Sequence, residues 1–476
     1  MVGDRNSDLR TWSLVGAMLA LVAAAAYVIS VFQPTTALII GLSALVILAA
    51  MINVDVALYI LIFSMLLGPQ VVVSEAAGTS LASRGLTLRL DDLLLVVIGL
   101  LWLARIAIYS DVGVFTKTPL NRQIAWYTFA CILSTGVGMV FGRVEVLTGS
   151  LFTLKYIEYF LIYFLTANSL KNRTQVRNYT VALLVVALIV SVIGIAQIPA
   201  GGRASAPFED TGEGIRAANA EPNSFGGYLV LMLALALSVL LTQESRRVKL
   251  TLTFLAALLL STLGLTLSRA SYLALVPLYL SLLFFSKRRT GLLIGALLTA
   301  GAFVIFAPPN ILERIEYTYT APREAEQVII GQLHLDSSTT IRLRNWQTAF
   351  TEGLPQHPLL GSGVTGWGLV DAQYPRTLVE LGVFGFTIFL WLILSTFRSA
   401  KDHYRQVKDP LLKGVTLGFL VGHIAILTHA IGANSFIIVR IMEPYWFLAA
   451  IAMMAPQLEE QPSSAQAPPA FAGIRR

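Results

Sequence analysis

The chain has 476 residues, of which 56% are hydrophobic and only 13% are charged, and its mean hydropathy is +0.72. These values exclude a soluble globular enzyme and indicate a polytopic membrane protein. The formal net charge of +7 does not indicate nucleic-acid binding, because the basic residues are spread over short segments between apolar runs. A single cysteine, Cys131, excludes an internal disulfide framework.

Apolar runs recur along the whole chain at the length needed for a membrane helix, which is roughly 20 residues. The sequence therefore predicts an all-α, polytopic helix bundle of about 14 transmembrane helices. A second apolar run follows the first at once, so we expect the first to be retained as an anchor rather than cleaved as a signal peptide. In chain order, the expected spans are 12–32, 36–52, 57–73, 93–109, 124–141, 151–167, 179–198, 225–241, 250–267, 272–285, 291–306, 377–397, 415–429 and 441–456.

The connecting segments predict the orientation of the bundle. Lys and Arg cluster after every second expected span, and the positive-inside rule places such clusters in the cytoplasm. Both termini are then cytoplasmic, and three features lie on the outer side: a loop at about 199–222, the turn around Arg269, and a segment at about 307–376. We divide the chain into N-terminal transmembrane helices (1–150), a transmembrane core that carries these outer loops (151–456), and a disordered cytoplasmic tail (457–476).

Arginines gather at the span ends and loops of the expected outer side. For any one of them, contact with lipid phosphate explains the position as well as a ligand site does. For the set, convergence on one anionic ligand is the better explanation, because a guanidinium binds phosphate oxygens bidentately and keeps its charge at any cellular pH. The cytoplasmic loops, in contrast, are short and carry no phosphate-binding loop motif. The arginines of the outer side are Arg203, Arg216, Arg269, Arg342, Arg344, Arg376 and Arg440.

Four outer stretches resemble, in the same order, the signature stretches of the O-antigen ligase and O-antigen polymerase superfamily. They are RASAPFEDTGEGIRAANAEPNSFGGYL (203–229), SRASYLAL (268–275), SSTTIRLRNWQTAFTEGLPQHPLLGSGVTGW (337–367) and DAQYPRTLVELGVFG (371–385). The resemblance covers roughly residues 155–446. It implies a C-type membrane glycosyltransferase of the bacterial inner membrane, which takes glycans from undecaprenyl diphosphate on the outer leaflet. It also implies an inverting reaction that uses no metal and no other cofactor.

Two ligase motifs are kept in this sequence, one of them incompletely. The first is an Arg followed one helical turn later by Leu, here Arg269 and Leu273. The second begins with His and a small amide or Ser and ends in Gly-x-x-Gly. Its glycines are present as Gly382 and Gly385, but Asp371 stands at the position of the His and Ala372 at the next.

Asp371 is the first candidate for handling the acceptor hydroxyl, either as a proton acceptor or by orienting the acceptor sugar. The alternative is an N-cap of the following helix, because Asp is a preferred capping residue and Pro375 is typical of a first turn. Glu380 is a second candidate, since an ionisable residue in a membrane helix is functional by default. Its alternative role is an i, i+4 ion pair with Arg376.

The donor diphosphate is expected to bind Arg203 or Arg216 together with Arg269 and Arg342. Arg342 and Trp346 would share one face of a short helix and hold a phosphate and a sugar ring, unless this helix is only an interfacial amphipathic one. We therefore expect Arg269 to act in catalysis as well as in binding, because charge on the departing pyrophosphate grows in the transition state.

The resemblance favours a polysaccharide polymerase, because acidic residues in place of the motif His resemble exopolysaccharide polymerase-like members. A ligase that joins the glycan to a lipid-anchored core or another acceptor is the alternative. Expected partners are the lipid-linked oligosaccharide, an acceptor glycan or glycolipid, membrane lipids, a flippase and a chain-length regulator. A flippase or transporter of lipid-linked sugars would need ionisable residues near mid-membrane and access to both sides, whereas these arginines lie on one face. A non-catalytic membrane scaffold would need no such cluster.

Overall fold

The structure is a computed structural model of the chain, and it describes residues 54–68, 70–74, 86–89, 95, 99, 116–198, 203–207, 222–286, 289, 291–292, 329–330, 333–334, 337–368 and 370–460. The expected spans 12–32 and 36–52 lie outside the described residues, as do most of 93–109 and 291–306. Arg216 also lies outside them, together with most of the expected outer loop 199–222, residues 307–328 of the expected outer segment 307–376, and residues 461–476 of the expected tail.

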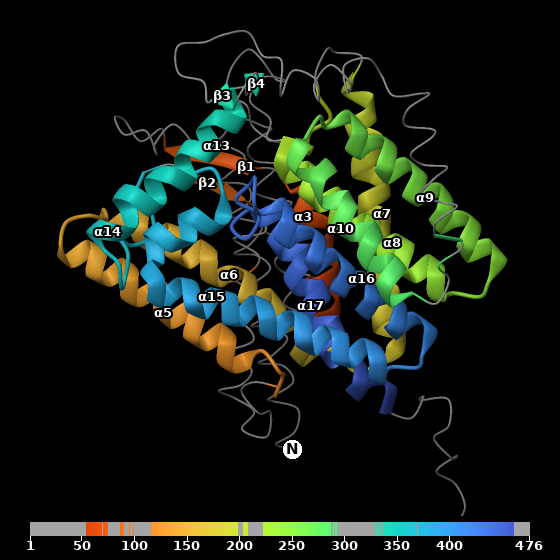
Figure 1. The fold of residues 1–476 in the computed structure, drawn as a ribbon. Coiled ribbons are helices and arrows are strands. Elements are labelled where there is room, and N and C mark those ends of the chain that lie inside the picture. The colour runs from red at the N-terminus through yellow and green to blue at the C-terminus, as the bar shows by residue number, and fades with distance from the viewer. Residues whose placement is uncertain are drawn as a thin grey trace, which may run out of the picture.

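Helices make up nearly all of the described chain (Figure 1). Two short antiparallel strand pairs accompany them: β1 (Gln70–Ser74) with β2 (Leu86–Arg89), and β3 (Ile329–Ile330) with β4 (Leu333–His334). The helices are α3 (Val54–Leu67), α5 (Asn121–Val140), α6 (Val146–Ser169), α7 (Arg173–Ala196), α8 (Pro222–Thr242), α9 (Arg246–Leu265), α10 (Arg269–Phe285), α13 (Ser337–Thr348), α14 (Leu354–Gln356), α15 (Gln373–Gln406), α16 (Pro410–His429) and α17 (Val439–Glu460).

Six helices in the described residues are long and apolar enough to cross a bilayer, namely α5, α7, α8, α9, α15 and α16. The chain is therefore a multi-pass membrane protein, as the composition predicts. Several expected boundaries differ from the observed ones. The span expected at 57–73 ends with α3 at Leu67, the span expected at 377–397 extends over 373–406 as α15, and α17 continues helically to Glu460 into the segment expected to be a disordered tail.

The centre of the bundle is the contact between α8 and α16, whose apolar windows are each 78% buried. Gly414, Gly418 and Gly422 form a stripe on α16 that faces α8. A Cβ at Gly418 would lie 2.8 Å from the Cα of Leu235, and one at Gly414 would lie 3.0 Å from the Cα of Val239. The small residues let the two backbones approach closely, which is how membrane helices gain packing contacts where lipid is as apolar as the side chains.

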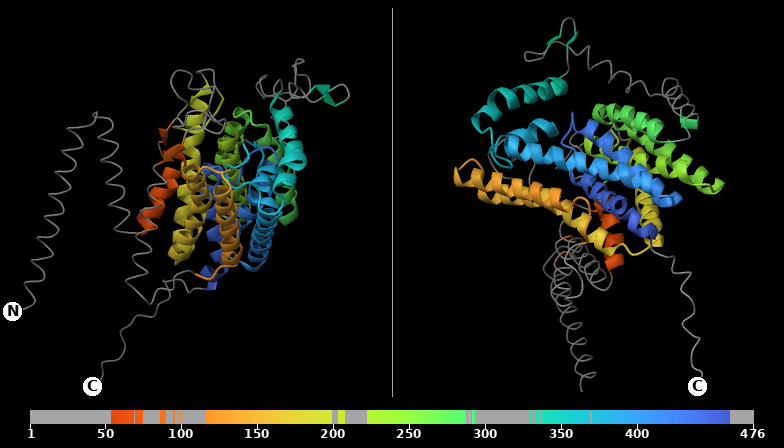
Figure 2. Two further views of the ribbon diagram at one scale, coloured as in Figure 1. Left: turned by 90° about the vertical axis from the view of Figure 1, so that its left-hand side faces the viewer. Right: turned by 60° about the horizontal axis from the view of Figure 1, so that its bottom comes forward.

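Polar contacts hold the end of the bundle that we expect to face the cytoplasm. Arg173 at the start of α7 forms an ion pair of 2.8 Å with Asp409, the N-cap of α16. Asp55 in α3 accepts hydrogen bonds from Gln175 and from the hydroxyl of Tyr179. These contacts put the starts of α3, α7 and α16 at one end, so that α8, α10, α15 and α17 begin at the other (Figure 2).

The longest helix, α15, is broken at Gly382, where φ is +65°. A loop inserts into the break and bonds to the backbone groups that the helix can no longer pair. Irregular backbone is tolerated at membrane depth only where protein satisfies its polar groups, as this loop does. The four backbone bonds are Ser362 N to Val379 O (2.9 Å), Gly363 N to Glu380 O (2.9 Å), Val383 N to Pro358 O (2.9 Å) and Phe384 N to Leu359 O (3.1 Å).

Candidate functional site

Arg269 is the first residue of α10, in the tight turn that the sequence predicts. The preceding helix, α9, ends at Leu265, and Leu267 turns the chain with a φ of +54°. Ser268 is the N-cap of α10, and its side chain accepts a hydrogen bond from the amide of Ser271. The half-buried Arg269 thus projects from a fixed helix start, where the helix dipole also favours an anion.

Arg342 lies across a glycine from the start of α10. A Cβ on Gly432 would lie 3.6 Å from the Cβ of Ala270 and 4.0 Å from Cδ of Arg342. The glycine belongs to the loop between α16 and α17, and Arg342 belongs to α13, so three separate segments meet here. The structure therefore brings Arg342 close to the residue that follows Arg269.

Asp371 forms an ion pair with Arg342, with 3.7 Å between Nη2 of the arginine and Oδ2 of the carboxylate. Its side chain is 39% exposed, whereas that of Arg342 is 17% exposed. The expected N-cap role is wrong, because Ala372 occupies the N-cap position of α15 and no side chain caps that helix. Asp371 is instead an accessible carboxylate beside an arginine.

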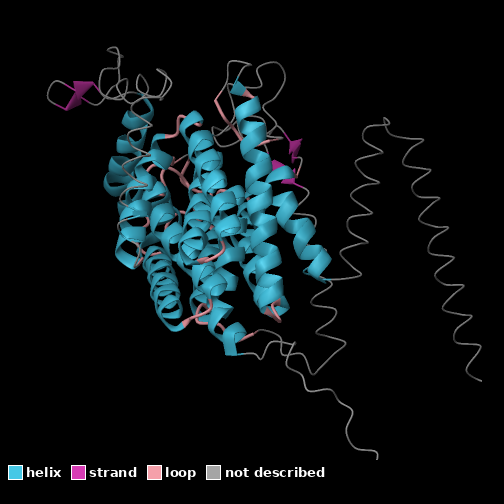
Figure 3. Ribbon diagram, turned by 90° about the vertical axis from the view of Figure 1, so that its right-hand side faces the viewer, coloured by secondary structure: helices cyan, strands magenta, loops and turns pink. Residues whose placement is uncertain are grey.

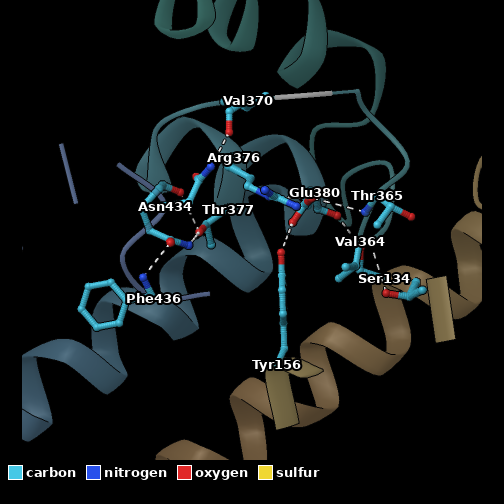
Figure 4. A network of polar contacts seen from close by, with 12 residues as sticks. Ser134, Tyr156, Val364, Thr365, Val370, Arg376, Thr377, Glu380, Asn434 and Phe436 are labelled. Atoms are coloured by element: carbon cyan, nitrogen blue, oxygen red, sulfur yellow. Dashed lines mark hydrogen bonds and ion pairs between the residues drawn. The ribbon is translucent and has the colours of Figure 1, made fainter. Parts of the chain in front are cut away.

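The segment that carries Asp371 is held by the loop between α16 and α17 (Figure 4). Asn434 donates from Nδ2 to the carbonyl of Val370 at 2.9 Å. The backbone N–H of Gln373 donates to the carbonyl of Ala430 at 3.2 Å, and the side-chain Oε1 of Gln373 accepts from the backbone N–H of Phe436 at 2.9 Å. Two hydrogen bonds therefore hold the backbone on the two sides of Asp371, and a third holds the side chain of Gln373.

Trp346 lies on α13, as the Arg-x-x-x-Trp spacing predicts, and packs against the first turn of α15. Its ring stacks on Phe350 at 6.0 Å between centroids and lies 6.4 Å from the ring of Tyr374. The hydroxyl of Tyr374 is bonded to the carbonyl of Leu427 at 2.7 Å, which anchors that ring to α16. The half-buried Trp346 is thus set beside the ion pair of Arg342 and Asp371.

The other described arginines of the expected outer side differ in burial: Arg203 is half-buried, Arg440 is buried and Arg344 is exposed. Arg203 is half-buried in a segment whose next residue, Ala204, donates to the carbonyl of Leu265 at 3.0 Å, and it lies close enough to Tyr272 to interact with it electrostatically. Arg440 is buried, and its Nη2 donates to the carbonyl of Pro207 at 3.2 Å. Arg344 is exposed on α13.

Arg376 and Glu380 form a buried ion pair of 3.0 Å within α15, which confirms the structural alternative for this carboxylate (Figure 4). Their exposed fractions are 6% and 2%. The hydroxyl of Tyr156 donates to Oε2 of Glu380 at 3.0 Å, and the amide of Thr365 approaches Oε1 at 3.3 Å. Glu380 thereby joins α6, the inserted loop and the broken helix.

His357 follows the short helix α14 as its C-cap and accepts a hydrogen bond at its carbonyl from the backbone N–H of Gly361, which closes a turn. Partial burial and the nearby guanidinium of Arg143 lower the pKa of His357. Arg143 also donates to the carbonyl of Gly361 at 3.2 Å. These contacts place His357 beside the loop that enters the break in α15.

A set of buried polar residues next to Arg269 in the structure is not among the site residues that the sequence predicts. His429 at the end of α16 contacts Ser271, and Ser268 donates to Asn223 at the start of α8. No sequence spacing links these residues, because His429 and Ser271 are 158 positions apart. A usable signal is that polar side chains cluster at the outer ends of otherwise apolar spans. Within the described residues there is no group of His, Cys, Asp or Glu that could hold a metal ion.

Comparison with protein-family models matches residues 254–390 to the family described as O-antigen ligase. The matched range runs from α9 through Arg269, α13 and Asp371 into α15, so it contains most of the site described above. None of the curated proteins matches this chain.

Proposed function

We propose that this membrane protein is a glycosyltransferase of surface polysaccharide biosynthesis and that it polymerises glycans carried on undecaprenyl diphosphate; the match of residues 254–390 to the family described as O-antigen ligase supports this proposal. The observation that carries this proposal is that Arg342, in an ion pair with Asp371, lies near Gly432 together with Ala270, the residue that follows Arg269. A cation paired with an accessible carboxylate, near the helix start that carries a second arginine, suits a reaction in which an anion departs and a hydroxyl loses its proton.

Donor binding uses the guanidinium groups. Arg269 and Arg342 bind the diphosphate oxygens, and Arg203 adds a third positive charge from the neighbouring segment. The start of α10 points its helix dipole at the same anion. The diphosphate also competes with Asp371 for Arg342, so donor binding frees the carboxylate for the acceptor.

The transfer is a single displacement at the anomeric carbon. The acceptor hydroxyl oxygen forms the new glycosidic bond while the bond from the anomeric carbon to the diphosphate oxygen breaks. Asp371 accepts the hydroxyl proton, and undecaprenyl diphosphate leaves with its charge held by Arg269 and Arg342. Attack from the opposite face inverts the anomeric configuration. Trp346, which is half-buried and lies one helical turn after Arg342 on α13, serves as the platform for a sugar.

Glu380 takes no part in this proposed chemistry. Its carboxylate is already bonded to Arg376, Tyr156 and the amide of Thr365, and it is 2% exposed. An acceptor hydroxyl would have to displace an ion pair to reach it. We therefore assign it to the stability of the broken helix.

The site faces the outside in the proposed topology, with both termini in the cytoplasm, and a flippase supplies the lipid-linked donor from within. A polymerase uses a second lipid-linked unit as acceptor, whereas a ligase uses a lipid-anchored core, and the acidic residue at position 371 favours the polymerase. A transporter of lipid-linked sugars is the candidate from another class.

The test is a reaction in liposomes that contain the purified full chain and undecaprenyl-diphosphate-linked repeat units, without nucleotide sugar. A polymerase yields a ladder of longer lipid-linked glycans. A ligase yields a product only when lipid-anchored core oligosaccharide is added. A transporter yields no longer glycan in either case but moves a labelled lipid between leaflets.

A further inference from the structure

A buried chain of hydrogen bonds lies behind Arg269 and connects three helix ends with the loop after α16. Ser268 donates to Oδ1 of Asn223 at 2.7 Å, and the hydroxyls of Ser268 and Ser271 are 2.8 Å apart. Nε2 of His429 lies 3.2 Å from the hydroxyl of Ser271, and its Nδ1 lies 2.7 Å from the hydroxyl of Ser435. Ser271, His429 and Ser435 are each 0% exposed.

The directions of these bonds follow from the acceptor at the end of the chain. The carbonyl oxygen of Asn223 can only accept, so it takes the single hydroxyl proton of Ser268. Ser271 must then donate to Ser268, and its oxygen must accept from a protonated Nε2 of His429. Nδ1 is left as the acceptor for the hydroxyl of Ser435. These hydrogen bonds therefore select one neutral tautomer of His429. Its Nε2 donates on the side of α10, and its Nδ1 accepts on the side of the loop after α16.

The loop that follows His429 also holds the segment of Asp371. Ala430, Asn434 and Phe436 make the three hydrogen bonds to Val370 and Gln373 described above. One side of the imidazole therefore holds the helix start that presents Arg269, and the other side holds the loop that positions Asp371. His429 is the side chain through which these two supports are joined.

Close packing leaves this connection little freedom. A Cβ at Gly226 of α8 would overlap the hydroxyl of Ser271, and one at Gly227 would lie 3.1 Å from Cε1 of His429. Ser271 and His429 are thus confined by α8 as well as by their hydrogen bonds. A buried polar side chain needs such partners, whereas an apolar residue of similar size would fill the position without that requirement.

We propose that His429 is a positioning residue for glycosyl transfer, which sets the distance between Arg269 on the donor side and Asp371 on the acceptor side through Ser271 and Ser435. The inference rests on the proposed function, because it assigns these two sides. His429 itself touches neither substrate. Its loss should lower turnover, since a displacement of about 1 Å between reacting groups costs up to about a hundredfold in rate.

The test compares His429→Leu with His429→Gln in the liposome reaction. Glutamine carries a donor and an acceptor on one amide and can replace both bonds, whereas leucine replaces neither. We expect His429→Leu to lower kcat at least about tenfold while the KM for the lipid-linked donor changes less than about threefold. His429→Gln should recover most of the lost kcat.

The matched control is His423→Leu. His423 lies on the same helix, is equally buried at 0% exposure, and is bonded through Nδ1 to the hydroxyl of Tyr445 at 2.7 Å. We expect this variant to lower thermal stability while kcat, measured well below its melting temperature, stays within about threefold. If His423→Leu and His429→Leu lower kcat equally, or if glutamine at 429 rescues nothing, the positioning role is wrong.

A second pair of variants keeps the test informative if His429→Leu does not fold. Ser435→Ala removes the donor to Nδ1, and Ser271→Ala removes the acceptor of Nε2 while Ser268 keeps its N-cap bond. Both should lower kcat in the same direction as His429→Leu, and wild-type kcat in both would overturn the proposal. Absence of any glycan extension by the wild-type chain would instead reject the proposed function, so the two failures are distinguishable.

Discussion

Arg342 lies with its Nη2 3.7 Å from Oδ2 of Asp371, an ion pair that joins α13 to the start of α15. The pair is looser than a direct hydrogen bond, and the carboxylate is more exposed than the guanidinium. An incoming diphosphate can take the place of the carboxylate at Arg342. The ion pair would thus couple binding of the donor to release of Asp371, the carboxylate proposed to accept the proton of the acceptor hydroxyl.

Replacement of Arg342 by alanine should reduce glycan extension by about a hundredfold, because one preorganised cation facing the developing charge is lost. Arg342→Lys should recover only part of the rate, since an ammonium cannot bind two phosphate oxygens bidentately. The matched control is Arg344→Ala, which removes an exposed arginine from the same helix. Equal losses for Arg342→Ala and Arg344→Ala would reject the specific role of Arg342.

Replacement of Asp371 by asparagine should lower kcat by about a hundredfold or more, because the amide cannot accept the proton of the acceptor hydroxyl. The KM for the donor should hold or fall, since the variant no longer competes with the diphosphate for Arg342. Initial rates at varied donor concentration separate the two effects. Full turnover by Asp371→Asn would exclude this residue as the base.

Glu380→Gln should destabilise the fold, because Arg376 is left with an uncompensated charge in a buried site. Breaking a buried pair in this way costs about 3–5 kcal/mol. A double variant, Arg376→Met with Glu380→Leu, removes both charges and should melt at a higher temperature than either single variant. Thermal melting of the purified variants in detergent compares these melting temperatures. A Glu380→Gln protein of wild-type stability that lacks activity would instead return Glu380 to the chemistry.

Gly382→Ala should disrupt the break in α15. The glycine has a φ of +65° and a ψ of −172°, a backbone region essentially confined to glycine, which costs a residue with a side chain about 1–3 kcal/mol. The added Cβ would also overlap the carbonyl oxygen of Leu359 in the inserted loop. Gly136→Ala in α5 is the control, because nothing lies within 4 Å of its added Cβ and alanine favours a helix. A melting temperature for Gly382→Ala equal to that of Gly136→Ala would contradict this account of the break.

Much of the membrane architecture is predictable from sequence because its signals are local. Apolar runs identify most spans, and the basic clusters predict the end at which Arg269 lies. The i, i+4 spacing of Arg376 and Glu380 also predicts their ion pair correctly. Figure 3 shows the helical bundle that these local signals predict. Such features depend on one helix and its own side chains.

Contacts between segments that are far apart in the sequence could not be predicted. The motif spacing identifies Gly382, but it does not reveal that this glycine breaks the helix to admit residues 358–363. The N-cap expectation for Asp371 failed because the helix begins one residue further along, where the loop after α16 fixes the backbone. His429 escaped notice because its partner Ser271 is contributed by another span.

The central claim is that Arg269 binds and stabilises the departing diphosphate of a lipid-linked glycan donor. The most direct measurement is the rate of glycan extension in liposomes by wild type, Arg269→Ala and the Arg344→Ala control, with folding verified by thermal melting. We predict extension by wild type and by the control, and a loss of at least about a hundredfold for Arg269→Ala. A folded Arg269→Ala protein that extends the lipid-linked repeat at the wild-type rate would contradict the claim.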